Sequence, residues 1–224
     1  MSYDLVIRGG TVVDGSGLPR YRADVGIVGD RIARIGTIHA RGREEVDARH
    51  QIVAPGFIDG HTHMDAQVAW DPLGTCSCFD HVLEMMKHPR SVVTFSDSGA
   101  HVSQIMDSSL QTQVLAYWVR RRQALTLEEG VRMLTLEPAT AWGFHDRGLL
   151  KEGMAADVIV FDPDRVAPEM PEVVNDLPAG ARRLRQKATG FHASIVNGRV
   201  VLRDGEHTGA YPGRVLRGPL AAER

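Results

Sequence analysis

The stretch from Gln51 to Asp65, QIVAPGFIDGHTHMD, constrains this chain more than any other. It begins with an apolar run typical of a strand buried on both faces, and it ends in His61-Thr62-His63. Side chains two residues apart on a strand point the same way, so both imidazoles are expected to project from the C-terminal end of the strand. Imidazoles suit a borderline-soft divalent metal. The pattern therefore favours a metal site over its alternative, a strand end with two solvated histidines.

The bulk composition places the chain among soluble globular proteins. It has 224 residues, of which 43% are hydrophobic and 24% charged, enough for one or two domains. A net charge of −2 argues against a nucleic-acid or anionic-membrane partner. We expect neither a membrane span nor a signal peptide. The two cysteines, Cys76 and Cys78, are too close together in the sequence to stabilise the fold through a disulfide, which favours the reducing cytoplasm.

Both ends of the chain show short strands separated by turn residues. Residues 3–13 predict a hairpin that turns at Gly9-Gly10, and a second strand pair is expected to turn at Gly29-Asp30. Near the other end, residues 193–202 predict a hairpin with Asn197-Gly198 at its turn. We therefore expect both ends to build one β domain around an inserted α/β segment.

The middle of the chain alternates between helical and extended patterns. The expected elements are a helix over 79–87, a strand from Ser91 to Phe95 that leads into Asp97, a helix around 114–119, a helix that opens with a capping box at Thr126 and Glu129 and closes near Glu137-Pro138, a strand over 156–162, and a loop over 166–189. An acidic residue thus follows a buried strand here, as the histidines do in the first motif.

Several segments together resemble the amidohydrolase superfamily. They are DLVIRGGTVVDGSG, the His-x-His strand, HPRSVVTFSDSGAHV, EPATAWGFHDRGLLKEGMAADVIVFD, and VNDLPAGARR followed by VNGRVVLRDGEHTGAYPGRVLRG. The later segments are similar to the D-aminoacylase branch, the N-acyl-D-amino-acid deacylases. The resemblance implies a β-sandwich made from both termini, a metal-dependent (β/α)₈ barrel, and zinc-dependent hydrolysis of N-acyl-D-amino acids.

The resemblance also implies roles for individual residues. His61 and His63 match the metal ligands of the first barrel strand. Asp97 matches the last-strand aspartate that contacts the metal and acts as general base and acid. Each imidazole needs a hydrogen-bond partner to fix its tautomer, and Asp59 and Asp65 are candidates. His101 is a candidate partner for Asp97.

The chain departs from the family in its length. Only 34 positions separate His63 from Asp97, whereas a complete barrel needs about 250 residues. Strands two to seven are therefore expected to be absent, together with the metal-ligating cysteine, two further histidines and the basic residue for the substrate carboxylate. Cys78 does not match the metal cysteine. We expect weak zinc binding, little or no turnover, and a homo-oligomer that covers the exposed barrel edges.

The expected fold class is α/β. A small β-sandwich from residues 1–53 with 148–224 would carry an incomplete remnant of the barrel in residues 54–147. The first functional hypothesis is a hydrolase of non-peptide carbon–nitrogen bonds that acts on N-acyl-D-amino acids. The alternative is an inactive remnant that serves as a binding or oligomerisation module, and a third reading is a different amide substrate, such as a cyclic amide.

Overall fold

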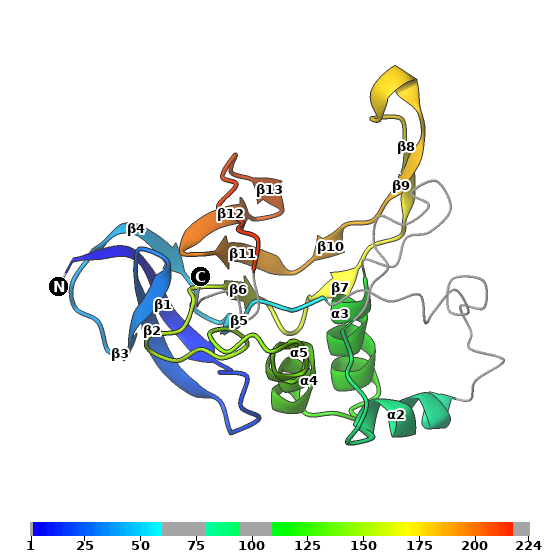
Figure 1. The fold of residues 1–224 in the computed structure, drawn as a ribbon, viewed down its shortest axis with the longest axis horizontal. Coiled ribbons are helices and arrows are strands. Elements are labelled where there is room, and N and C mark those ends of the chain that lie inside the picture. Colours follow the sequence, from blue (N-terminus) through cyan, green and yellow to red (C-terminus); the bar gives the residue numbers. More distant parts are fainter. Residues whose placement is uncertain (1, 60–78, 95–108, 217–224) are drawn as a thin grey trace, which may run out of the picture.

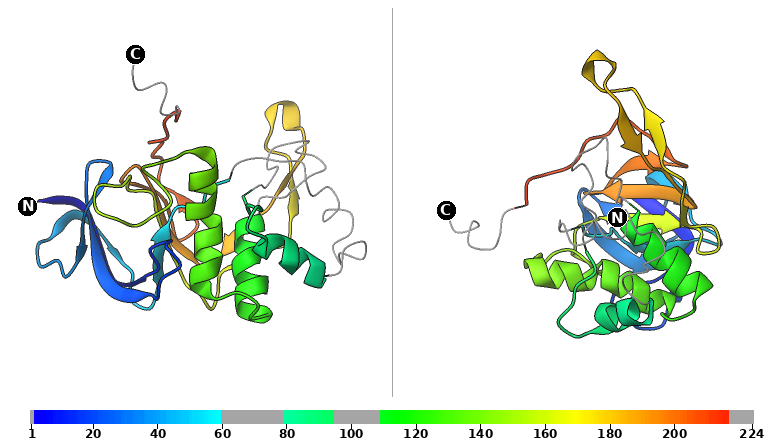
Figure 2. Two further views of the ribbon diagram at one scale, coloured as in Figure 1. Left: turned by 60° about the horizontal axis from the view of Figure 1, so that its bottom comes forward. Right: turned by 90° about the vertical axis from the view of Figure 1, so that its right-hand side faces the viewer.

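The fold is a mixed β-sheet with a layer of helices against part of one face (Figure 1). The computed structural model describes residues 2–59, 79–94 and 109–216. The helical layer and the strands stay separate when the molecule is turned (Figure 2). None of the helices within these ranges is long and apolar enough to cross a membrane.

Strands from both ends of the chain share the main sheet. Its order is β13-β12-β11-β6-β5-β1-β2-β3, with β4 also paired to β1. The strands are β1 (Tyr3–Val12), β2 (Tyr21–Val28), β3 (Arg31–Gly36), β4 (Gly42–Asp47), β5 (Ile52–Pro55), β6 (Val158–Phe161), β11 (Phe191–Val196), β12 (Arg199–Arg203) and β13 (Glu206–His207). The two halves meet where β5 pairs antiparallel with β6, with Ile52 opposite Phe161 and Pro55 opposite Val158.

Strands β5 and β6 are buried on both faces, as predicted for the apolar run after Gln51. Val53 and Val160 belong to an apolar cluster shared with β1, β2 and β11. Ile52 and Phe161 point to the other side and join a cluster formed with the helices. Because neighbouring side chains on a strand alternate between faces, these two short strands connect the two cores.

The helical layer consists of α2 (Phe79–Lys87), α3 (Leu110–Gln113), the π-helix η1 (Val114–Arg121), α4 (Leu127–Leu134) and α5 (Leu136–Trp142). The capping box is confirmed, because Thr126 Oγ1 accepts the Glu129 N–H at 3.1 Å and Glu129 Oε2 accepts the Thr126 N–H at 2.7 Å. The expectation of one helix closing near Glu137-Pro138 is wrong. The non-helical backbone of Thr135 ends α4 first, and Pro138 lies in the first turn of α5, where proline is tolerated.

The prediction of a turn at Gly9-Gly10 is wrong, because β1 continues through both residues with a β-bulge. Gly9 adopts a φ of +67°, and its N–H donates to Asp24 Oδ1 at 2.8 Å. A Cβ on Gly10 would lie 2.4 Å from Val53 Cγ2. Glycine is needed here for a bulge and a close approach between strands, not for a reversal of the chain.

The two other predicted turns are confirmed. Gly29 and Asp30 connect β2 to β3. Asn197 and Gly198 connect β11 to β12 with φ angles of +45° and +76°, as expected for the Asn-Gly pair of a tight hairpin.

Residues 166–189, predicted as a loop, form an arm that projects from the sheet (Figure 1). The arm contains β7 (Ala167–Pro168), β8 (Glu172–Val174), the 3-10 helix η2 (Pro178–Gly180), β9 (Arg183–Arg185) and β10 (Ala188–Thr189). β7 pairs with β10 and β8 with β9. The strands are only two or three residues long, too short to produce a recognisable alternation in the sequence.

Candidate functional site

The segment that leads to the His-x-His motif leaves the sheet earlier than predicted. β5 ends at Pro55, so the expected continuous strand up to His63 is wrong for residues 56–59. The Gly56 N–H still donates to the Asp157 carbonyl at 2.9 Å, and Phe57 then packs at 6.4 Å from the Phe161 ring. The Pro-Gly pair interrupts the strand pattern, and the chain turns toward the helices.

The end of this segment is fixed against α4. The Ile58 N–H donates to the Leu134 carbonyl at 3.0 Å. Leu134 is fully buried and is the last residue of α4, where helix carbonyls have no partner within the helix. This hydrogen bond therefore gives the Leu134 carbonyl a partner and fixes the position of Ile58.

The segment that leads to Asp97 meets the first one at Ile58. Thr94, with 2% of its surface exposed, donates from Oγ1 to the Ile58 carbonyl at 2.8 Å. Residues 91–94 belong to no strand of the described part of the chain, so the prediction of a strand from Ser91 is wrong for these four residues. Val93 instead packs against the apolar cluster of the helices.

A third segment reaches the same place. Gln111, in α3, donates from Nε2 to Asp59 Oδ2 at 3.4 Å. Asp59 follows Ile58, and Gln111 comes soon after the chain re-enters the described part at Ser109. The segments that lead to the two motifs and the segment that follows the second one thus meet at Ile58 and Asp59.

The predicted site residues themselves lie outside the described residues. His61 and His63 fall within 60–78, and Asp97 falls within 95–108. The same holds for Cys76, Cys78, and the candidate partners Asp65 and His101. Asp59 is described and exposed, and its expected bond to an imidazole stays a prediction.

Sequence reasoning missed the residues that hold these segments together. Thr94 carries a hydroxyl within the apolar run VVTF. Because a buried hydroxyl needs a hydrogen-bond partner, this position indicates a bond to another segment of the chain. The bond from Ile58 to Leu134 joins main-chain atoms far apart in the sequence, and no sequence pattern signals it.

A network of partly buried polar groups lies where β5 ends and β6 begins. Asp157 Oδ2 pairs with Arg147 Nη1, and Asp157 Oδ1 accepts the Asn197 N–H at 2.7 Å. Arg147 Nη2 donates to Asn197 Oδ1 at 3.2 Å, and Asn197 Nδ2 donates to the Pro212 carbonyl at 2.8 Å. Burial lowers the pKa of the Arg147 guanidinium from its usual value. The network ties the start of β6 to the β11–β12 turn and the C-terminal segment, which is a structural role.

Two open clefts, with volumes of about 900 and 840 Å³, lie elsewhere on the molecule. Neither is lined by Ile58, Asp59 or Thr94. In the larger cleft, Arg43 pairs with Asp4 at 3.0 Å and Arg214 with Asp30 at 2.7 Å, so two of its arginines are already neutralised. Within the described ranges, no group of three or more His, Cys, Asp or Glu side chains is placed to hold a metal. The convergence at Ile58 is the better candidate, because both motifs lead away from it.

Comparison with known proteins links this architecture to one family. The sequence model of the Amidohydrolase family matches residues 78–202, more than half of the chain. A D-aminoacylase from Alcaligenes xylosoxydans xylosoxydans is 53% identical over 64 residues, which are 28% of this chain and 13% of that protein. An N-acyl-D-glutamate deacylase from the same organism is 56% identical over 70 residues, 31% of this chain and 14% of that protein. The matched region is thus a small part of either relative.

Solved structures show the same fold. A crystal structure of D-aminoacylase aligns with a TM-score of 0.61 at 15% identity and covers 93% of this chain and 98% of that chain. An N-acyl-D-glutamate deacylase from Bordetella bronchiseptica, complexed with zinc and a phosphonate inhibitor, aligns with a TM-score of 0.59 at 17% identity, covering 92% and 99%. The resemblance read from the sequence is confirmed, and the chain belongs to the Amidohydrolase family.

Proposed function

We propose that His61, His63 and Asp97 hold a divalent metal and that the chain hydrolyses the amide bond of N-acyl-D-amino acids, with weak metal binding and little turnover. The observation that carries this proposal is the hydrogen bond from Thr94 to the Ile58 carbonyl. His61 comes three residues after Ile58, and Asp97 three residues after Thr94. At 3.8 Å between successive Cα atoms, three residues span at most about 11 Å, which limits how far His61 can lie from Ile58 and how far Asp97 can lie from Thr94.

The donor set fits a catalytic metal. Two imidazoles and one carboxylate are the smallest protein ligand set that leaves a position open at zinc. The related N-acyl-D-glutamate deacylase was solved with zinc, and a binuclear metal centre is the subject of a D-aminoacylase structure. When bound, such a metal lowers the pKa of a water ligand to about 7 and polarises a carbonyl group.

Asp97 performs the proton transfers in this proposal. As water adds to the amide carbon, the Asp97 carboxylate accepts a proton from it. As the carbon–nitrogen bond breaks, Asp97 returns that proton to the leaving nitrogen. The products are the carboxylic acid and the free D-amino acid. His61 and His63 stay neutral throughout, because only a neutral imidazole has a lone pair for a metal.

We expect low activity because most strands of the barrel are absent from the chain. Asp97 follows His63 by only 34 positions, which leaves no room for the other strands of a complete barrel. Those strands would exclude water and bind the substrate carboxylate. We propose accordingly that residues 1–53 with 148–224 form a small β-sandwich, that residues 54–147 are the remnant of the metal-binding (β/α)₈ TIM barrel, and that the protein acts in the cytoplasm.

The first test measures zinc and hydrolysis together. We expect the purified chain to bind zinc and His61→Ala to bind it more than about 100-fold more weakly, since even changes outside the ligand set cost 10–100-fold. Binding is measured by titration, and hydrolysis by release of D-amino acids from their N-acetyl derivatives. His39→Ala, which removes an exposed histidine from another part of the chain, is the control and should bind like the wild type. Equal zinc binding by wild type and His61→Ala would refute the proposal.

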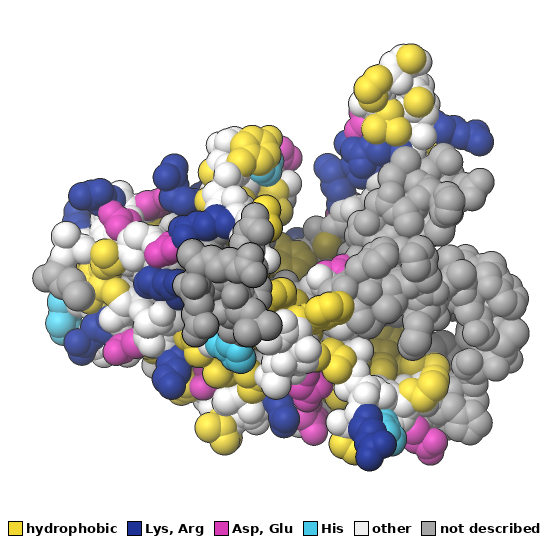
Figure 3. Space-filling model, in the orientation of Figure 1, with side chains coloured by type: hydrophobic (Ala, Val, Ile, Leu, Met, Phe, Trp, Pro, Cys, Tyr) yellow, Lys and Arg dark blue, Asp and Glu magenta, His cyan; other side chains and the backbone are white. Residues whose placement is uncertain are grey.

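One observation favours the second candidate function, an inactive oligomerisation module. The arm exposes 87% of Met170 and 63% of Val173. In Figure 3, apolar side chains gather at the tip of the arm, with Lys and Arg beside them. A two-stranded arm has little stability of its own, so a second copy that covers these side chains would stabilise it.

We expect a dimer or larger assembly at micromolar concentration, measured by sedimentation. Met170→Ser combined with Val173→Ser should shift the assembly toward the monomer, because it removes the apolar surface. Leu18→Ser, at a side chain that is 65% exposed elsewhere, is the matched control and should leave the assembly unchanged. A wild-type chain that sediments as a monomer would contradict self-association. Zinc binding without detectable hydrolysis would favour the inactive module over the enzyme.

A further inference from the structure

We propose that Asn197-Gly198 is a latent deamidation site, kept unreactive by hydrogen bonds of the folded chain and controlled by residues 208–216. Asparagine is chemically labile, and most so before glycine, which has no side chain to obstruct its own nitrogen. The other asparagine of the chain, Asn175, precedes an aspartate. The proposal does not depend on the proposed metal site.

The reaction needs water as its only co-reactant. The Gly198 nitrogen loses its proton to the solvent and bonds to the side-chain carbonyl carbon of Asn197. The bond from that carbon to the amide nitrogen breaks, and the nitrogen takes a proton from the solvent and leaves as ammonia. Water then opens the cyclic imide at one of its two carbonyl carbons. The product is aspartate, or isoaspartate, in which the main chain runs through the former side chain.

The β11–β12 turn depends on both residues of the labile pair. Asn197 and Gly198 have φ angles of +45° and +76°, a backbone region that favours asparagine and glycine. A Cβ on Gly198 would also lie 2.0 Å from the Gly29 carbonyl oxygen. The fold therefore requires this pair, and its surroundings have to suppress the reaction.

Both reacting groups are occupied by hydrogen bonds. The Gly198 N–H donates to the Ala156 carbonyl at 2.9 Å, so its proton is not free to leave. The Asn197 amide is held at both ends, because Oδ1 accepts from Arg147 Nη2 at 3.2 Å and Nδ2 donates to the Pro212 carbonyl at 2.8 Å. The amide cannot turn onto the Gly198 nitrogen without breaking these bonds. With 7% of Asn197 exposed, water also has little access.

Pro212 is the partner that is most easily displaced. Residues 208–216 belong to no strand or helix, and 86% of Tyr211 and 82% of Val215 are exposed. Such a segment opens at a lower free energy than the sheet beneath it. Opening frees one end of the Asn197 amide and admits water to it.

Two side-chain interactions hold this segment on either side of Pro212. Thr208 Oγ1 donates to the Val200 carbonyl at 2.7 Å, and Arg214 pairs with Asp30 at 2.7 Å. Their loss should therefore raise the fraction of molecules in which Pro212 has left its place.

The test follows deamidation of the full chain in mildly alkaline buffer, by mass spectrometry of the peptides that contain Asn197 and Asn175. In the folded wild type, Asn197 should react on the order of 100-fold more slowly than in the chain unfolded in urea. Thr208→Val combined with Arg214→Ala should speed the reaction at Asn197 roughly 10-fold, because two hydrogen bonds together contribute about that factor to the opening equilibrium. Asn175, exposed in the arm, should react at the same rate in both proteins.

Circular dichroism verifies that the variant is folded, and Arg214→Ala alone, with a smaller increase, replaces it if it is not. Thr189→Val combined with Arg43→Ala is the matched control. Thr189 also donates to a main-chain carbonyl, at 3.0 Å, and Arg43 also pairs with a carboxylate, at 3.0 Å, but neither interaction flanks Pro212. This control should react at the wild-type rate.

Two results would overturn the proposal. Deamidation of Asn197 as fast in the folded wild type as in urea would show that the fold does not protect it. A wild-type rate in folded protein that lacks the Thr208 and Arg214 interactions would show that residues 208–216 do not control the site.

Discussion

Replacing Asp157 with alanine is expected to destabilise the protein by up to about 3–5 kcal/mol, because it leaves the mostly buried Arg147 guanidinium without its carboxylate. The Arg147 side chain is 12% exposed and that of Asp157 is 21% exposed. The substitution also removes the acceptor of the Asn197 N–H in the β11–β12 turn. One change thus affects a charge pair and a turn that share the same carboxylate.

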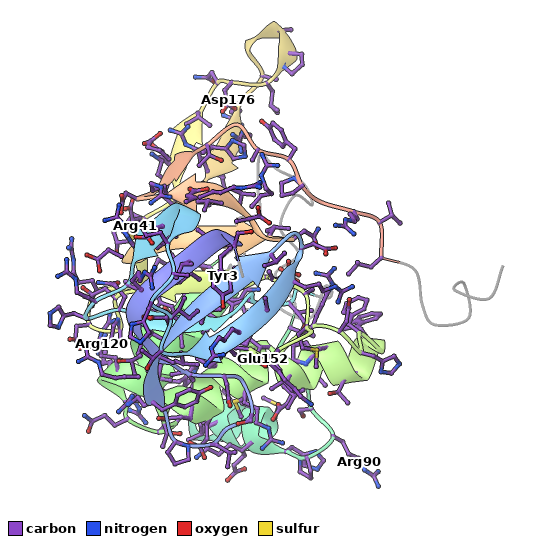
Figure 4. All side chains as sticks on the ribbon, turned by 90° about the vertical axis from the view of Figure 1, so that its left-hand side faces the viewer. Tyr3, Arg41, Arg90, Arg120, Glu152 and Asp176 are labelled. Carbon is purple, nitrogen blue, oxygen red and sulfur yellow. The ribbon has the colours of Figure 1, made fainter. Side chains whose placement is uncertain are left out.

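Chemical denaturation followed by circular dichroism measures this loss. Asp157→Asn keeps an oxygen for the Asn197 N–H and lacks the charge, so it should fall between wild type and alanine. Asp176→Ala is the control. Asp176 lies in the arm (Figure 4) and pairs with Arg183 at 2.6 Å, with 42% of the Asp176 side chain and 33% of the Arg183 side chain exposed. Its loss should change stability little, since solvent screens exposed pairs. Equal effects of the two alanine substitutions would show that the Arg147 pair is not buried as described.

Replacing Phe161 with alanine should cost a further large amount, about 3–5 kcal/mol, through the cavity it leaves. Phe161 is fully buried between the sheet and the helices. Its ring packs against Phe57 at 6.4 Å and Phe191 at 6.1 Å. The loss would therefore remove the contact between β6 and Phe57, the residue before Ile58.

The same denaturation experiment checks this effect. Phe161→Leu keeps most of the volume and should cost clearly less than alanine, because the remaining cavity is smaller. Leu18→Ala, at a side chain that is 65% exposed, should leave the denaturation midpoint unchanged. A loss in Phe161→Ala no greater than in Phe161→Leu would mean that the surrounding side chains fill the space freely.

Features coded by neighbouring residues were predictable from the sequence. The capping box at Thr126, the turn at Asn197-Gly198 and the burial of β5 each depend on residue types within a few positions. Their physical causes are local hydrogen bonds, backbone preference and hydrophobic periodicity. The structure accordingly confirms all three.

Features that depend on distant partners were not predictable. The sequence around Gly9 predicts a turn because no neighbouring residue reveals that Asp24 accepts the Gly9 N–H and that Val53 packs beside Gly10. The sequence predicts too long a strand after Gln51 because the hydrogen-bond partner of Ile58, the Leu134 carbonyl, is 76 positions away. The candidate site shows the same division. Its residue types are predictable from two sequence motifs, whereas the hydrogen bond between Thr94 and Ile58 is seen only in the fold.

The pairing of β5 with β6 has a consequence for biosynthesis. The two strands are neighbours in the sheet and are separated by roughly 100 residues of chain. A ribosome that adds roughly 5–20 residues per second leaves β5 without this neighbour for on the order of 5–20 seconds. During that time one edge of β5 and its apolar side chains are exposed in the nascent chain and accessible to chaperones. The half of the sheet that is translated first must therefore wait for the half that is translated last.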